Sequence, residues 1–137
     1  MTDPTPPTAA QHPARVGMQV QHRRYVSYQH AHYAGNLVDG AYGMALFGDV
    51  ATEMCIRTDG DEGLFASYSD VQFLAPLAAG DCIEVNATLV RVGTRSREME
   101  FALRITARGN PGRGGSAADV LEPPLVATTA RGVVVVP

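Results

Sequence analysis

The sequence has no lysine and no tryptophan, and it has only two cysteines. The absence of lysine excludes a lysine Schiff base, and with it pyridoxal phosphate held in its usual covalent form. Two cysteines cannot close a structural zinc site, and the four histidines show no HExxH spacing, so we expect no metal. Cys55 and Cys82 lie in regularly patterned segments, which favours free thiols in a reducing cytoplasm.

Long apolar runs and an excess of basic residues are also missing. No run approaches the 18 residues that a membrane-spanning helix requires, and the first residues lack the charged and apolar regions of a secretory signal. The net charge is -3, whereas binding to nucleic-acid phosphates needs a dominant basic face. We therefore expect neither a membrane nor a nucleic acid as a partner.

The composition that remains is that of one globular domain. Apolar residues make up 45% of the 137 residues and charged residues 18%, which is enough apolar material for a sizeable core. Prolines are frequent near the N-terminus, where apolar periodicity is weak. We predict a flexible N-terminal arm over residues 1–17 and a single domain over residues 18–137.

Hydropathy patterns predict one helix and five strands. Residues 39–56 are apolar over most of a helical circumference, which is typical of a helix that is buried or wrapped by other elements. Alternation with a period of two predicts the strands, at residues 18–28, 65–73, 83–89, 99–105 and 125–136. Glycines and prolines over residues 109–124 predict a long loop, which we expect to be mobile without ligand.

This element order predicts an α+β fold in which a five-stranded antiparallel sheet wraps a long central helix. A single sheet has one face to bury, and the apolar helix can fill its concave side. Such a sheet leaves open edges, and pairing into dimers is the expected way to cover them.

Three carboxylates are the first candidates for chemistry. Asp39, Asp49 and Glu53 fall on one narrow arc of the predicted helix at about 100° per residue. Carboxylates in apolar surroundings are candidate general acids and bases. The alternative is structural: Asp39 caps the helix, and the other two form a solvated stripe.

The loop before the helix supplies further candidates. His32 and Tyr33 can donate and accept protons near the positive helix N-terminus, although loop histidines, His30 included, are often only surface residues. The first helical N–H groups, at Gly40 and Ala41, have no intrahelical partners and suit the oxygen of a ligand carbonyl.

Several motifs resemble those of the beta-aminoacyl-CoA ammonia-lyases over residues 24–136. They are the runs HYAGNLVDGAYGMALFGDVATEM, DGDEGLFASYSDVQFLAPLAAGD, VGTRSREMEF and EPPLVATTARGVVVV. The resemblance implies the hotdog fold, 3-aminobutyryl-CoA or beta-alanyl-CoA as substrate, and no cofactor beyond the coenzyme A of the substrate. It also implies a homo-oligomer, a dimer at least and a hexamer in the usual form, with the acyl-CoA lying between protomers.

The resemblance gives the candidate residues provisional roles in the reaction 3-aminoacyl-CoA ⇌ 2-enoyl-CoA + ammonia. Asp39 or Glu53 would transfer the proton, and Asp49 would hold the amine or tune its neighbours. His32 and Tyr33 would be polar contacts to substrate, and the N–H groups of Gly40 and Ala41 would stabilise the enolate oxygen.

The turn GTRSR has two interpretations. Its residues Arg95, Ser96 and Arg97 can clamp the phosphates of coenzyme A, or they can form an ordinary charged turn.

Two other functions stay open at this point. One is an acyl-CoA thioesterase of the same fold, in which a helix carboxylate in the position of Asp49 directs water to the carbonyl. In those enzymes a glycine often stands where this chain has Asp39. The other is a non-catalytic acyl-CoA-binding module, for which three acids on one arc would be a costly pocket lining.

Overall fold

The computed structural model describes residues 14–137. The arm predicted over residues 1–17 therefore lies mostly outside the described residues. Its last part already joins the sheet, because the Gly17 N–H donates to the Leu89 carbonyl at 2.7 Å.

The predicted α+β architecture is confirmed, with one long helix and a five-stranded antiparallel sheet. The elements follow in the order β1 (Gln19–Tyr25), η2 (Tyr28–His30), β2 (Ala31–Tyr33), η3 (Ala34–Asn36), β3 (Leu37–Val38), α1 (Gly40–Asp59), β4 (Leu64–Phe73), β5 (Leu77–Ala78), β6 (Cys82–Val92), β7 (Ser96–Gly109) and β8 (Ala118–Val135).

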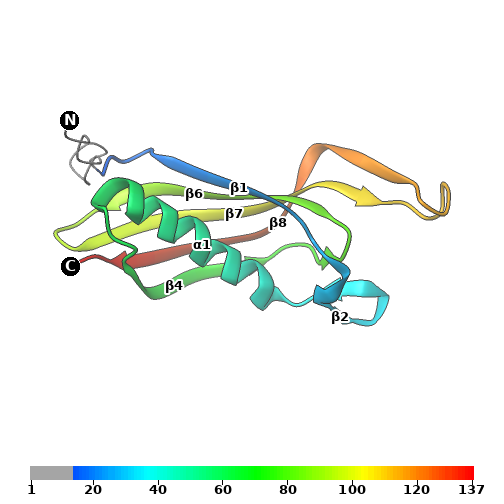
Figure 1. The fold of residues 1–137 in the computed structure, drawn as a ribbon, viewed down its shortest axis with the longest axis horizontal. Helices are drawn as coiled ribbons and strands as arrows, with labels where there is room; N and C mark the ends of the chain where they lie inside the picture. Colours follow the sequence, from blue (N-terminus) through cyan, green and yellow to red (C-terminus); the bar gives the residue numbers. More distant parts are fainter. Residues whose placement is uncertain (1–13) are drawn as a thin grey trace, which may run out of the picture.

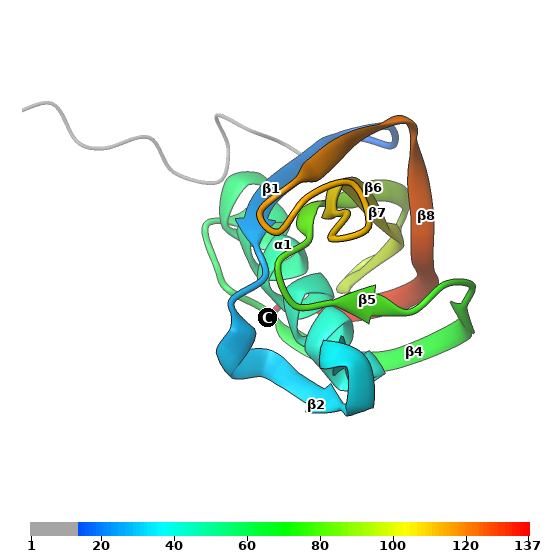
Figure 2. The same ribbon diagram turned by 90° about the vertical axis from the view of Figure 1, so that its right-hand side faces the viewer.

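The large sheet has the strand order β1-β6-β7-β8-β4 and curves around α1 (Figures 1 and 2). The sequence patterns did not predict a second, smaller sheet, β2-β3-β5, which joins two short strands of the segment before the helix to one that follows β4. It closes the N-terminal end of α1. Within residues 14–137, no helix is long and apolar enough to span a membrane.

The core lies between α1 and the concave face of the sheet. The alternation predicted along β6 and β7 is confirmed, because Ile83, Val85, Leu103 and their same-face neighbours are buried while the intervening residues are more exposed. Phe47 of the helix stacks on a phenylalanine of β7 with ring centroids 5.1 Å apart.

The helix is wrapped by the sheet on one face, as predicted, and in the single protomer its opposite face is open. Its buried residues follow helical spacing, namely Gly43, Leu46, Phe47, Val50, Ala51, Met54, Cys55 and Thr58. The opposite face, with Ala41, Ala45, Asp49 and Ile56, is exposed. The helix also continues beyond residue 56 to Asp59, and Gly60 ends it in a left-handed conformation (φ 65°).

The pattern over residues 65–73 predicted simple alternation along β4. The structure does not show it. Its pairing with β8 shifts register twice, between Phe65 and Ser67 and between Ser69 and Gln72. Each shift inserts a bulge that turns the following side chains to the other face. The more buried side chains are therefore Phe65, Tyr68 and Val71.

The prediction of a long loop over residues 109–124 is wrong. The strands β7 and β8 continue to pair as far as Gly109 and Ala118, so the loop is only a short turn. This turn is held at its base by Asp119, which accepts hydrogen bonds from Asn110 (2.8 Å) and Arg113 (2.8 Å). The paired ends form a hairpin that projects beyond the body of the domain (Figure 1, yellow and orange).

Candidate active site

A cavity of about 610 Å³ lies at the N-terminal end of α1. Tyr33, Asp39, Gly40 and Ala41 line its more exposed rim. Buried side chains line its inner part, namely Val38, Leu77, Leu103 and Thr128. The cavity therefore has a polar mouth and a mostly apolar interior, as small-molecule sites usually do.

Asp39 stands at the N-cap position, but its carboxylate makes no capping hydrogen bond. Its backbone is extended (φ -70°, ψ 155°), as an N-cap requires, so the cap conformation exists without a contribution from the side chain. The half-buried carboxylate is thus available to a ligand in the cavity.

The start of α1 presents donors to the same space. The first N–H groups of a helix have no intrahelical acceptor and carry the positive end of the helix dipole. Gly40 and Ala41 both line the cavity, so an oxygen that gains negative charge there would be stabilised.

Gly40 lies directly against Phe73. A Cβ atom at residue 40 would lie 2.5 Å from a ring carbon of Phe73, so this ring would have to move if residue 40 carried a side chain. The end of β4 therefore packs directly on the first turn of α1 and forms one wall of the cavity.

The structure separates the two loop candidates before the helix. Tyr33 lines the cavity, whereas His32 is exposed, does not line it, and meets the Tyr33 ring edge-on at 4.6 Å. His30 packs on Tyr42 with ring centroids 4.5 Å apart. Burial raises the pKa of Tyr42, and Arg24 partly offsets this rise.

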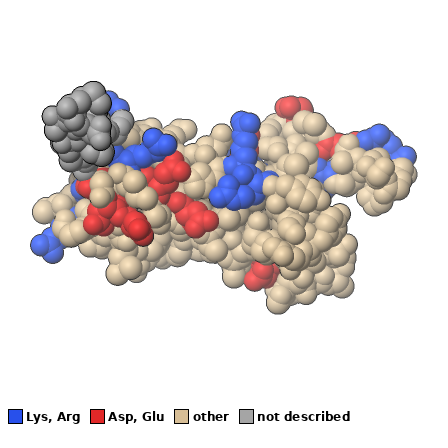
Figure 3. All heavy atoms as spheres, viewed as in Figure 1, with Lys and Arg blue, Asp and Glu red and all other residues tan. Residues whose placement is uncertain are grey.

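Asp49 and Glu53 do not join Asp39 in the cavity. Asp49 is exposed and lies about 15 Å further along the helix axis, at a rise of about 1.5 Å per residue. Acidic side chains gather on the surface over the C-terminal half of α1 (Figure 3). Within one protomer, Asp49 therefore cannot act on the same atom as Asp39.

Glu53 is held by two basic partners. His22 Nε2 lies 2.8 Å from one carboxylate oxygen, and Arg57 Nε donates to the other at 2.9 Å. The hydrogen bonds from His22 and Arg57 lower the pKa of Glu53, which makes it a weaker base. The helical spacing of Glu53 and Arg57 could have indicated this pair from the sequence, whereas nothing local pointed to His22.

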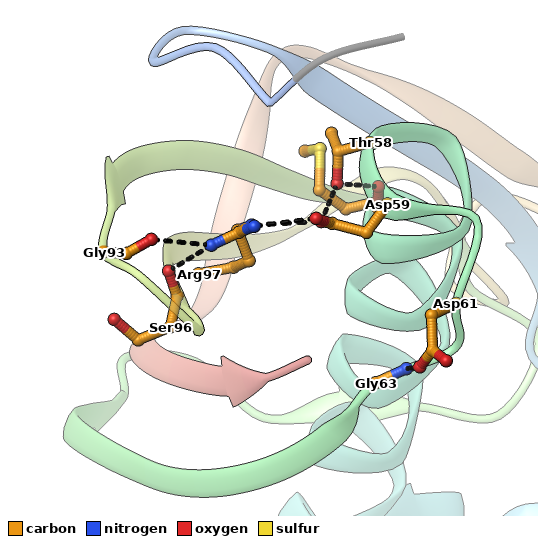
Figure 4. A network of polar contacts seen from close by, with 8 residues as sticks. Thr58, Asp59, Asp61, Gly63, Gly93, Ser96 and Arg97 are labelled. Carbon is orange, nitrogen blue, oxygen red and sulfur yellow. Dashed lines mark hydrogen bonds and ion pairs between the residues drawn. The ribbon is translucent and has the colours of Figure 1, made fainter. Parts of the chain in front are cut away.

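The guanidinium of Arg97 is fully engaged in hydrogen bonds within the protein. Figure 4 shows its guanidinium between the end of α1 and the β6–β7 turn. It donates to both oxygens of Asp59, at 3.0 and 2.7 Å, and to the carbonyls of Gly93 and Ser96, both at 2.9 Å. Partial burial raises the pKa of Asp59, but hydrogen bonds from Arg97 and Thr58 lower it further, so the net shift is downward. Arg97 thus holds the end of α1 against the β6–β7 turn. Its guanidinium is therefore not available to bind the phosphates of coenzyme A, as the predicted clamp requires.

Arg95 and Ser96 lie away from the Asp39 cavity. Arg95 is exposed and lines a separate hollow of about 390 Å³ with Leu64 at the other end of the domain. The Ser96 carbonyl accepts the Gly93 N–H at 2.9 Å and closes the turn. A clamp built from Arg95 therefore cannot serve the cavity of its own protomer at close range.

No group of three potential metal ligands comes together anywhere in residues 14–137. Both cysteines are free, and burial raises the pKa of the Cys55 thiol to about 11, so it is not a nucleophile at neutral pH.

Comparisons with known proteins place the chain in a family. The model of the thioesterase superfamily matches residues 35–110. A 3-aminobutyryl-CoA ammonia lyase of Acetoanaerobium sticklandii is 51% identical over 107 residues, which are 78% of this chain and 85% of that protein.

Solved structures agree with this placement. The beta-alanyl-CoA:ammonia lyase of Clostridium propionicum superposes with a TM-score of 0.83 at 35% identity, covering 89% of this chain and 87% of that one. A hexameric hotdog fold thioesterase of Campylobacter jejuni superposes with a TM-score of 0.66 at 18% identity, covering 82% of this chain and 78% of that one. At that identity the likeness shows the fold alone.

Proposed function

The chain belongs to the thioesterase superfamily and, within it, to the beta-aminoacyl-CoA ammonia-lyases, and we propose that it reversibly eliminates ammonia from a 3-aminoacyl-CoA to give the 2-enoyl-CoA. One observation at the site supports this proposal most strongly. The Asp39 carboxylate makes no capping hydrogen bond, and it lies beside the helix N–H groups of Gly40 and Ala41. This places a base and an oxyanion site in one cavity.

The reaction needs both groups. The thioester acidifies the proton on C2, and Asp39 removes it while the helix N–H groups stabilise the enolate oxygen. The substrate amine is protonated, so the C2 electron pair forms the C2–C3 double bond as the C3–NH3⁺ bond breaks, and neutral ammonia leaves with the electrons of that bond. Asp39 returns the proton to ammonia, which leaves as ammonium, and the carboxylate is regenerated. Tyr33 at the rim is the polar contact to substrate that we retain from the sequence.

We also propose that the functional enzyme is a homo-oligomer in which β4 forms the interface between protomers. This strand ends the sheet, it exposes Leu64 (78%) and Phe73 (60%), and its one charged residue, Asp70, lies where the pairing with β8 shifts register. The other edge, β1, carries Arg23 and Arg24, and such charges protect an edge strand from pairing. Antiparallel pairing of two β4 edges would continue the sheet across a two-fold axis.

This pairing would also complete the site. In an antiparallel pair, the Phe73 end of one β4 lies beside the Leu64 end of the other. Phe73 lines the cavity with Asp39, and Leu64 lines the hollow with Arg95. The substrate's phosphates can then reach the exposed Arg95 of the neighbouring protomer, which restores a role in substrate binding for this residue. If light scattering at the assay concentration finds a monomer and this monomer is fully active, the proposed assembly is refuted.

We place the enzyme in the cytoplasm, because its two free cysteines suit a reducing compartment. The substrate supplies its own coenzyme A, and the chemistry proposed for Asp39 needs no other cofactor.

The second candidate function is thioester hydrolysis, which the superfamily match favours. Incubation with crotonyl-CoA and ammonia separates the candidates by mass spectrometry. A lyase adds the mass of ammonia to the thioester, a thioesterase releases coenzyme A, and a binding module changes nothing. Release of coenzyme A without the adduct would overturn the proposed lyase.

A further inference from the structure

The cavity offers very different surroundings at its two ends. Asp39, Gly40 and Ala41 lie at the rim, where a large polar coenzyme can remain outside. Leu77 and Leu103 lie inside and are 8% and 0% exposed. Only the acyl end of a substrate is small and apolar enough to enter that part.

Gly43 forms part of the inner wall. It lies one turn after Gly40 on the buried face of α1 and lines the same cavity. A Cβ atom placed on residue 43 would lie 3.1 Å from the Cδ1 methyl of Leu103, which is tighter than ordinary contact. An alanine here would therefore occupy the space between helix and sheet and force the Leu103 methyl to shift.

We propose that Gly43 is a specificity-determining residue, which keeps the inner cavity open for an alkyl substituent on C3 of the substrate. This proposal rests on the proposed function. In the proposed binding mode the thioester oxygen lies at the helix N–H groups and C2 and C3 lie at Asp39, and the alkyl substituent on C3 points toward the apolar inner part of the cavity. A 3-aminobutyryl group would fill this space with its methyl, whereas a beta-alanyl group would leave it empty.

The test compares Gly43→Ala with Gly48→Ala for two substrates, 3-aminobutyryl-CoA and beta-alanyl-CoA. Gly48 lies in the same helix, and a Cβ there would meet nothing within 4 Å. Both variants gain the same helix propensity, so they differ in the space that the new methyl occupies. Circular dichroism and melting temperature check that both are folded.

We expect Gly43→Ala to lower the ratio of kcat/KM values, 3-aminobutyryl over beta-alanyl, by about tenfold or more, the usual effect of one methyl group in a tight pocket. Gly48→Ala should leave the ratio unchanged. Gly43→Ala combined with Leu103→Val, which removes the crowded methyl, should recover part of the lost ratio. An unchanged ratio in Gly43→Ala, or an equal loss for both substrates, would overturn the role of Gly43 while leaving the lyase function intact. A wild-type protein inactive on both substrates would overturn the proposed function, and this inference with it.

Discussion

Replacing Arg97 with methionine separates the structural role of this residue from a role in binding coenzyme A. Methionine has a similar length and keeps the apolar contacts, but it removes the guanidinium. Asp59, whose side chain is 17% exposed, would keep only its hydrogen bond from Thr58 at 2.7 Å. The carbonyls of Gly93 and Ser96 would each lose a donor.

The expected destabilisation follows from these lost contacts. Removing one partner of a buried ion pair costs about 3–5 kcal/mol. Because water can still reach Asp59, we expect the lower end of this range, about 3 kcal/mol, which lowers the melting temperature on the order of 10 °C. The double variant Arg97→Met with Asp59→Leu should recover part of this loss, because it leaves no unpaired charge.

The assay is thermal unfolding together with steady-state kinetics, and Arg95→Met is the matched control. Arg95 has no ion pair within the described residues, so its loss should leave the melting temperature unchanged and raise KM for the acyl-CoA. Arg97→Met should melt early and keep the wild-type KM at temperatures where it is folded. A wild-type melting temperature with a raised KM in Arg97→Met would refute the structural assignment and restore the predicted clamp.

Three further predictions concern Asp39, Glu53 and the β7–β8 hairpin. Asp39→Asn should lower kcat by about a hundredfold or more without changing the melting temperature, because the Asp39 side chain makes no capping hydrogen bond that the substitution could remove; a near-normal rate would show that the carboxylate is not the base. The pKa of Glu53 is lowered from 4.5, so its bonds to His22 and Arg57 stabilise the fold above that pH and are lost as the pH falls through the folded value. The stability difference between wild type and Glu53→Gln should thus shrink from pH 7 to pH 4 in melting experiments, and a constant difference would contradict this. Hydrogen exchange should find amides of the hairpin over residues 107–120 protected, and uniformly fast exchange there would restore the mobile loop.

The parts of the fold that depend on local pattern could be predicted from the sequence. The alternation of Ile83 with Glu84, and of Leu103 with Arg104, is a property of each strand alone, so the inner face of β6 and β7 was readable. The bulges in β4 depend on its partner β8 and left no such trace. Glycines and prolines over residues 109–124 indicated a loop, but backbone pairing across the hairpin outweighs that composition.

In the candidate site, too, features set by local sequence could be predicted and features set by distant contacts could not. The position of Asp39 at the helix start could be predicted, because it immediately precedes the helix that the sequence itself marks. The structural role of Arg97 could not be predicted, since its partner Asp59 is 38 residues away in the sequence and the two meet only in the folded protein. The arc of three acids described one helix correctly, yet it could not show that β1 supplies His22 to Glu53 while Asp49 faces outward.

The central claim is that this protein breaks a carbon–nitrogen bond and leaves the thioester intact. The most direct measurement incubates the wild-type protein with 3-aminobutyryl-CoA and follows ammonium, enoyl-CoA and free coenzyme A thiol together. We predict that ammonium and enoyl-CoA appear in equal amounts and that no free thiol is released. Free thiol appearing without ammonium would show a thioesterase and contradict the account.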